Sequence, residues 1–326
     1  MKNSTAEGLK KLLEGKKGFK LICGAGNENL EEVEKLVAIY AKAGCSFFDL
    51  CAGEDVLKSA QKGLDFSIPK EEQKKYYFCV SVGTENDPHF KKARINPEKC
   101  KRCEQCIKIC PQGAINQYFK VVEKKCIGCL KCQKVCKHEA ILTTTHHSPL
   151  TSHLSLSCIE LHVSDVSDAE RNWDYLCKNF DGMLSICIGR GKLSDEQILS
   201  LVKRLVEKRE PYTTIIQADG SPMSGGEDDF KTTLQAVATG ELIQSANLPV
   251  YLTLSGGTNS KTAELSTLCG VDFHGVAVGS YARKIVKKYI EREDFWTNKA
   301  IFEEASKIAA SLMQSTFNPT QSSFHH

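Results

Sequence analysis

Eight cysteines lie within forty residues of the chain, in two runs that share one spacing, C-x2-C-x2-C-x3-C. Bacterial two-cluster ferredoxins bind their iron–sulfur cubes with this spacing. Three closely spaced thiolates can hold three corners of one cube, while a short helix carries the fourth cysteine to the other cube. The runs therefore predict two [4Fe-4S] clusters, with Cys100, Cys103, Cys106 and Cys136 as ligands of cluster I and Cys126, Cys129, Cys132 and Cys110 as ligands of cluster II.

Zinc is the alternative occupant of clustered cysteines. Zinc ribbons use two CxxC pairs separated by a longer spacer, whereas each run here places four cysteines within eleven residues, which favours iron. Pro111 follows the first run, but Lys137 stands at the equivalent place after the second. The missing proline loosens the local constraint, so we expect a more exposed cluster II that can also take a [3Fe-4S] form.

Residues 91–139 are basic, with thirteen Lys or Arg against four Asp or Glu. A positive surface raises cluster potentials and attracts an acidic redox partner or a regulatory protein. The alternative is that these lysines only solvate a small domain.

The composition excludes several protein classes. A net charge of +3 over 326 residues does not favour nucleic-acid binding. The chain has no apolar run of 18 residues, so no transmembrane segment is expected. Sixteen cysteines without a signal-peptide pattern indicate a reducing compartment, and we expect a cytoplasmic protein.

Eight short apolar runs predict strands that are buried on both faces. Helical patterns follow seven of them, with predicted caps at Asn29, Ser167 and Ser194. This alternation predicts an α/β fold, a (β/α)8 TIM-like barrel with the two-cluster ferredoxin domain inserted after strand 3. An open doubly wound sheet is the alternative. The predicted strands cover residues 19–23, 46–50, 76–82, 158–163, 183–188, 213–218, 249–254 and 273–278.

The same pattern predicts the domain organisation. It comprises an N-terminal helical extension (1–17), the first barrel part (18–90), the ferredoxin insertion (91–145), the second barrel part (146–292), a C-terminal helix (293–314) and a disordered tail (315–326).

Loops that follow the barrel strands build the functional face of this fold, and the last two of them often bind phosphate. Gly256 and Gly257 allow a ligand to approach the backbone closely, and Gly279 and Ser280 begin a helix whose amides favour an anion. Arg283 or Lys284 would complete a site for FMN or another phosphate-bearing ligand. A tight turn and a helix start without a ligand are the alternative.

Other polar groups stand at predicted strand ends, but no pair of them has a spacing that dictates a reaction. Three thiols are candidates for redox chemistry or for simple core packing. The loop at 218–230, with Asp219, Gly220, Ser224, Gly225 and Gly226, is either a lid or an ordinary long loop. The strand-end candidates are Cys23, Asp49, Cys51, Ser81, Glu160, His162, Cys187, Arg190 and Gln217.

Three segments resemble the cyanobacterial light-dependent period A (LdpA) family. They are FKLICGAGNENLEEVEKLVAIYAKAGCSFFDLCA near the N-terminus, and QADGSPMSGGEDDF…LSGGTNSKT and GVAVGSYARK in the C-terminal half. The resemblance implies an iron–sulfur redox sensor that reports photosynthetic electron transport to the circadian clock. It also implies clock proteins, including clock kinases, as partners, together with quinones. The lysine-rich composition and Lys137 depart from the family pattern.

Two functions are favoured over a third, a plain ferredoxin-like electron carrier on an inert barrel. One is an iron–sulfur redox sensor and electron-transfer protein that signals to a partner. The other is an FMN-dependent oxidoreductase in which the clusters supply electrons to a flavin at the barrel mouth. The absence of an evident acid–base pair favours the sensor, so an enzymatic activity is not the leading expectation.

Overall fold

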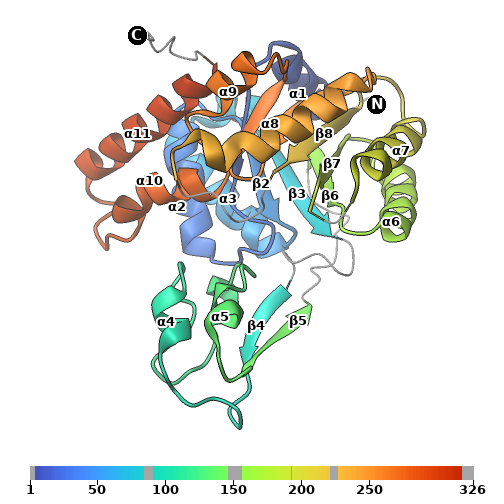
Figure 1. Cartoon of the computed structure of the whole chain (residues 1–326). Coiled ribbons are helices and arrows are strands. Elements are labelled where there is room, and N and C mark those ends of the chain that lie inside the picture. The colour runs from blue at the N-terminus through green and yellow to red at the C-terminus, as the bar shows by residue number, and fades with distance from the viewer. Residues whose placement is uncertain (1–3, 84–90, 146–155, 192, 221–226, 318–326) are drawn as a thin grey trace, which may run out of the picture.

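The computed structural model of the protein describes residues 4–83, 91–145, 156–191, 193–220 and 227–317 (Figure 1). Its main body is a closed parallel barrel with the strand order β1-β10-β9-β8-β7-β6-β3-β2. The predicted eight-stranded barrel is confirmed, and the open sheet does not apply. The strands are β1 (Gly18–Ile22), β2 (Phe47–Cys51), β3 (Tyr77–Gly83), β6 (Cys158–His162), β7 (Met183–Gly189), β8 (Thr214–Asp219), β9 (Tyr251–Ser255) and β10 (Gly275–Val278).

Helices surround the barrel and cover its apolar outer face (Figure 1). The largest buried cluster combines strand residues with the inward faces of these helices, which is the packing that strands apolar on both faces require. A 3-10 segment at Lys70–Lys75 leads into β3. The helices outside the insertion are α1 (Ser4–Glu14), α2 (Leu30–Lys42), α3 (Glu54–Ser67), α6 (Val166–Asn179), α7 (Asp195–Val206), α8 (Phe230–Ser245), α9 (Thr262–Leu268), α10 (Ser280–Ile290) and α11 (Lys299–Phe317).

Two of the three predicted helix caps are confirmed. The Asn29 side chain accepts a hydrogen bond from the Glu32 amide, and Ser194 forms a full capping box at the start of α7. The cap predicted at Ser167 is wrong, because α6 begins at Val166. The Asp165 carboxylate accepts from the third amide of that helix at 3.0 Å, and Asp is as good a cap as Ser.

Helix α1 closes the amino-terminal end of the barrel. Leu9 and Leu13 pack among apolar side chains that point inward from β2, β3, β6, β7, β8 and β9. The Tyr251 hydroxyl also donates to Glu14 at 3.0 Å. Since this end is filled, the strand ends at the other side form the accessible mouth.

The inserted lobe lies at the end of the barrel opposite α1 (Figure 1). Its two strands pair antiparallel, with Lys91 opposite Thr145 and Ile95 opposite Ile141. Strands β3 and β6 pair directly with each other, so the insertion interrupts the sequence but not the barrel. Its elements are β4 (Lys91–Ile95), α4 (Gln105–Ile109), a 3-10 turn (Glu123–Lys125), α5 (Lys131–Val135) and β5 (Ile141–Thr145).

The chain ends differ in detail from their predicted ranges. The predicted C-terminal helix at 293–314 is observed as α11 at Lys299–Phe317, so residues 315–317 are helical rather than part of a tail. The rest of that predicted tail, 318–326, lies outside the described residues, as do residues 1–3. No helix among the described residues is long and apolar enough to cross a membrane. The other domain boundaries stay predictions.

Candidate iron–sulfur centres and barrel-mouth site

The two cysteine runs fold into loops with the same backbone shape. Arg102 and Gly128 take φ values of 52° and 70°, and they occupy equivalent places in the two runs. Glu104 and Leu130, which precede α4 and α5, take φ values of 62° and 51°. These left-handed turns curl each loop around its own centre, so the sequence repeat is also a structural repeat.

The structure gathers the eight cysteines around two separate small cavities. Each cavity combines three cysteines of one run with the last cysteine of the other, which is the crossed arrangement that the spacing predicts. The first cavity is lined by Cys100, Cys103, Cys106 and Cys136, and the second by Cys110, Cys126, Cys129 and Cys132.

The chemistry around these sulfurs fits iron–sulfur clusters. Backbone amides of Ala114 and Ala93 donate to the sulfurs of Cys110 and Cys126 at 3.3 and 3.4 Å. Burial and neighbouring thiols raise the pKa of Cys132 to about 12. Four thiols held this close without a cation would therefore stay protonated, whereas bound iron would stabilise the thiolates.

The place of Lys137 bears on the expectation for the missing proline. Lys137 follows Cys136, and Cys136 lines the first cavity together with Cys100 and Cys103. Lys137 is therefore adjacent to a cysteine of the first cavity, and the expected exposure of cluster II stays a prediction. This adjacency arises because the fourth cysteine of each run crosses to the other centre.

The five residues predicted to bind a phosphate-bearing ligand all line one cavity of about 100 Å³ at the barrel mouth. Gly256 and Gly257 have φ values of 75° and 84°, and a Cβ at Gly257 would lie 2.2 Å from the Thr232 carbonyl oxygen. Glycine is thus required there by backbone geometry, whether or not a ligand binds. The five residues are Gly256, Gly257, Gly279, Ser280 and Arg283.

Arg283 is already engaged by the protein. Its Nε pairs with Glu32, and its Nη2 donates to the Cys23 carbonyl oxygen. Glu32 therefore already neutralises the positive charge of Arg283 that would otherwise bind a phosphate. Lys284 lies 3.1 Å from Glu227 on the exposed side.

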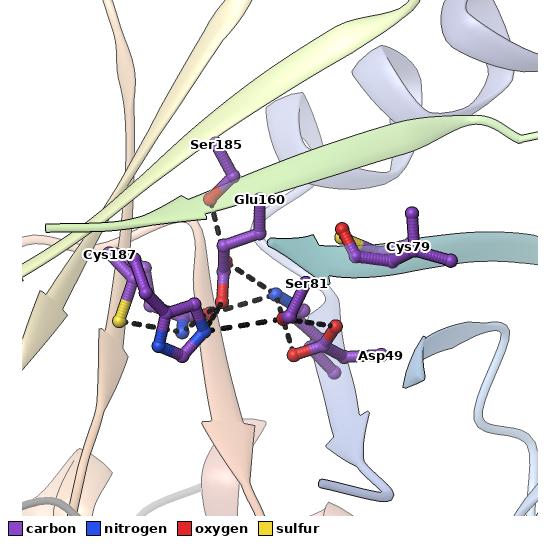
Figure 2. Close-up of polar contacts among 10 residues, drawn as sticks. Asp49, Cys79, Ser81, Glu160, Ser185 and Cys187 are labelled. Carbon is purple, nitrogen blue, oxygen red and sulfur yellow. Dashed lines mark hydrogen bonds and ion pairs between the residues drawn. The ribbon is translucent and has the colours of Figure 1, made fainter. Parts of the chain in front are cut away.

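Beneath the mouth, a buried polar network centres on Glu160 (Figure 2). Its Oε2 accepts from Lys20 at 2.6 Å and from Ser185 at 2.7 Å. Its Oε1 accepts from Gln217 at 2.8 Å and lies 3.3 Å from His162 Nε2. All five side chains are buried, so both carboxylate oxygens are held by neighbouring polar groups.

Asp49 extends the network toward β3. It accepts from Ser81 at 2.8 Å and lies 3.5 Å from Lys20. Ser81 in turn lies 3.2 Å from His162 Nε2. The network thus joins residues of β1, β2, β3, β6, β7 and β8 across the barrel interior (Figure 2).

Electrostatics hold this network charged. Burial works against the Lys20 ammonium, but Asp49, Cys79 and Glu160 together raise the pKa of Lys20 well above its usual value. Burial likewise works against the Glu160 carboxylate, yet Lys20 and His162 lower the pKa of Glu160 to about 2. Lys20 and Glu160 are therefore an ion pair at neutral pH.

The structure sorts the predicted strand-end residues into two groups. Asp49, Ser81, Glu160, His162, Cys187 and Gln217 come together at the mouth, as Figure 2 shows for several of them. Arg190 instead pairs with the exposed Asp195 at 2.7 Å. Burial raises the pKa of Cys23 strongly, which does not favour a reactive thiolate. Cys51 is also buried, at the end of β2 and outside the lining of the mouth cavity.

Sequence reasoning missed two members of the network, and the structure describes only part of the predicted loop after β8. Lys20 and Ser185 were not predicted, although a lysine within the apolar run FKLIC was a usable signal. Asp219 lines the mouth cavity, and Gly220 packs against the Gly256 carbonyl. Three other predicted members of the loop, Ser224, Gly225 and Gly226, lie outside the described residues.

The lobe and the barrel meet at a larger cleft of about 630 Å³. Lobe residues Lys125, Ile127 and Cys129 line one side, and residues of α2 and α10 line the other. Ile127 also lines the mouth cavity, so one lobe side chain reaches both spaces.

Lys92 joins the lobe to the barrel. Its buried ammonium donates to the Cys126 carbonyl oxygen at 2.8 Å and to the Gly26 carbonyl oxygen. It also lies 3.5 Å from Glu28. One lysine therefore connects the backbone of a predicted cluster II ligand to the loop after β1.

Comparison with known families agrees with this arrangement. Residues 93–116 and 119–142 match the 4Fe-4S binding domain, which gives the chain an iron–sulfur redox role. Residues 150–316 match the light dependent period A C-terminal domain.

The proteins that are similar to the chain include one curated relative and two solved structures. Light dependent period A of Synechococcus elongatus is 28% identical over 314 residues, covering 84% of this chain and 82% of that protein. A tryptophan synthase from M. tuberculosis has a TM-score of 0.43 at 8% identity, covering 94% and 99%. The truncated 3-deoxy-D-arabino-heptulosonate 7-phosphate synthase from Thermotoga maritima has a TM-score of 0.42 at 12% identity, covering 90% and 84%. The domain match spans half of the chain, and this protein belongs to the light dependent period A family.

Proposed function

We propose that this protein is an iron–sulfur redox sensor and electron-transfer protein. In this proposal, the redox state of cluster II changes the structure of the barrel mouth, and a partner protein recognises that change. The observation that carries the proposal is the position of Ile127 and Cys129. Ile127 lines the mouth cavity, and Cys129 lines the cleft between the lobe and the barrel. The second cysteine run thus borders the barrel directly.

The cysteines around the two cavities are the proposed ligands, in the sets that the spacing predicts. Each bound cluster would accept one electron, so the charge of its site would change by one. At an effective dielectric constant of about 20, one charge acts on another about 8 Å away with about 2 kcal/mol. Such an energy is enough to shift the ion pairs of the cleft, which include Glu32 with Arg283 and Glu227 with Lys284.

Lys92 is the proposed link between the two parts. A buried ammonium stabilises added negative charge nearby, and Lys92 holds the Cys126 carbonyl oxygen. Its other contacts, with Gly26 and Glu28, lie in the loop that leads into α2. A change of charge beside Cys126 would therefore act on the barrel through this side chain.

The first cysteine run is the proposed entry point for electrons. Cys103 is exposed, and exposed basic residues such as Lys101 and Arg102 lie beside it. An acidic redox partner fits this surface. The partner that recognises the redox state is proposed to be a regulatory protein. By analogy with the name of the Synechococcus relative, this partner is a clock protein or clock kinase. A quinone is the proposed small redox ligand.

Hydrogen exchange tests this proposal. The anaerobic protein is compared in its oxidised and dithionite-reduced states, and we expect changed protection at residues 24–32 and 279–291. Peptides of α6 and α7, which contribute no residue to the cleft or the mouth cavity, serve as the control. Equal exchange at the mouth in both states would contradict communication from the lobe, even if both clusters were present.

The cleft supports a second candidate, an FMN-dependent oxidoreductase. Its volume of about 630 Å³ falls within the range of about 300–1,000 Å³ for ligand pockets, whereas the mouth cavity falls below that range. Ser280 and Arg283 line both spaces. One flavin released per chain from the purified protein would favour this enzyme, and a flavin-free protein with full iron would favour the sensor.

A further inference from the structure

We propose that Glu160, His162 and Cys187 form a zinc site in the wall of the mouth cavity, separate from the iron–sulfur centres. One ligand atom from each residue lies within 4.8 Å of the others. All three side chains are buried, and all three line the cavity. This inference does not depend on the proposed redox function.

The sheet itself assembles the three ligands. Glu160 and His162 are two residues apart on β6, so both side chains point to the same side of the strand. His162 is the register partner of Cys187 on β7. Barrel strands are rigid positions for a metal site, because the ladder fixes the separation of the three ligands.

Neighbouring side chains already orient these ligands. The Gln217 amide donates to Glu160 Oε1 at 2.8 Å and to Cys187 Sγ at 3.5 Å, so one amide holds two ligands. Lys20 and Ser185 hold the other oxygen of Glu160. Hydrogen bonds of this kind to ligating groups are the usual support of a metal site.

The charge of the cavity favours a cation. The cavity is lined by three acidic residues, Asp49, Glu160 and Asp219, and one lysine, Lys20, lies beneath it. The remaining cation of the lining, Arg283, is paired with Glu32. Carboxylates therefore outnumber Lys and Arg side chains around the cavity, which is a composition that suits a divalent cation. Glu160 is already ionised, and the Cys187 thiol would release its proton to bulk water as its sulfur binds the metal.

The donor set selects the class of metal. One nitrogen, one oxygen and one sulfur suit zinc, and sites with three protein ligands leave a fourth position open. The cavity of about 100 Å³ gives that position room for a water or a small anion. Ile127 of the lobe faces the same cavity, so a ligand on the metal would lie between the metal and the second cysteine run.

Metal analysis of the anaerobically purified full chain tests the site. We expect one zinc per chain in addition to iron. Cys187→Ser and His162→Asn should each weaken zinc affinity at least about tenfold in competition with a chelator, while iron content is unchanged. Cys45→Ser is the matched control, because Cys45 is equally buried but lies outside the cavity.

Zinc could also enter the cysteine runs, and X-ray absorption at the zinc edge separates the two sites. We expect one sulfur and otherwise nitrogen or oxygen neighbours in the first shell. Four sulfur neighbours would overturn the proposal, as would zinc-free protein or another metal held by the same residues. If Cys187→Ser fails to fold, Gln217→Leu replaces it, with an expected loss of about tenfold in zinc affinity and a retained sulfur neighbour.

Discussion

The Lys92 ammonium lies 2.8 Å from the carbonyl oxygen of Cys126, a residue 34 positions further along the chain. This contact places a buried positive charge next to a predicted cluster II ligand, and the same ammonium reaches the barrel loop at Gly26 and Glu28. The inserted lobe is thus attached to the barrel at the point where its second cysteine run begins. The junction is part of the site rather than a simple linker.

Lys92→Met should lower the reduction potential of one cluster by tens of millivolts, because a buried cation that favours the reduced form is lost. Lys91→Met is the control, since it lies on the same strand with its side chain on the opposite face. Potentiometric titration followed by electron paramagnetic resonance measures both variants. Equal potentials in the two variants would show that Lys92 only supports packing.

Cys100→Ala and Cys126→Ala should each remove one cluster while the barrel stays folded, because the two cavities are separate. Iron per chain should then fall by about half in each variant. Cys269→Ala, an exposed cysteine outside both runs, is the control. Iron and sulfide analysis with circular dichroism checks this, and normal iron in both variants would rule out the ligand assignment.

Arg283→Ala should destabilise the protein by about 3 kcal/mol, because Glu32 would keep a largely buried and unpaired charge. Lys284→Ala, which removes the more exposed pair with Glu227, should cost less than about 1 kcal/mol. Thermal unfolding of the anaerobic proteins compares the stability of the two variants.

A phosphate-bearing ligand in the cleft should also bind Arg283→Ala more weakly than the wild type. Equal affinity for the two proteins would place that ligand elsewhere.

His274 should make stability depend on pH. Burial lowers the pKa of His274 below its ordinary value near 6.5, and its neutral Nδ1 accepts from the Leu252 amide at 3.0 Å. The unfolded chain binds the proton more readily, so the contribution is present above pH 6.5 and is lost as pH falls toward the folded pKa. The Tm of the wild type should fall more steeply below pH 6.5 than that of His274→Asn; parallel curves would contradict the assignment.

Association with an acidic electron carrier should weaken as salt rises, because the charged surface around Cys103 is exposed and screened by ions. Lys101→Glu should reduce the rate at which reduced flavodoxin transfers electrons to the protein. Lys11→Glu on α1, at the opposite end of the molecule, makes the same charge change and should have little effect. Rates that are independent of salt, or equally affected by both variants, would rule out steering by the lobe.

Much of the architecture was predictable because its signals are local. Short apolar runs alternating with helical patterns are enough to predict the barrel, and Asn29 and Ser194 mark helix starts through contacts within four residues. The cap predicted at Ser167 was wrong because Asp165, two residues earlier, accepts the hydrogen bond from the third amide of the helix. Asp and Ser are both good cap residues, so the sequence alone does not show which of the two begins the helix.

The sequence by itself determined the two cysteine runs, their basic surroundings and the order of strands and helices, since spacing and periodicity do not depend on distant contacts. Only the tertiary structure decided what meets at the mouth. Lys20 and Gln217 are separated by 197 residues and Lys20 and Glu160 by 140, and barrel closure alone brings them into contact. Lys92 likewise reaches Gly26 across 66 residues because the lobe docks on the strand ends. These contacts arise from packing, which no local pattern encodes.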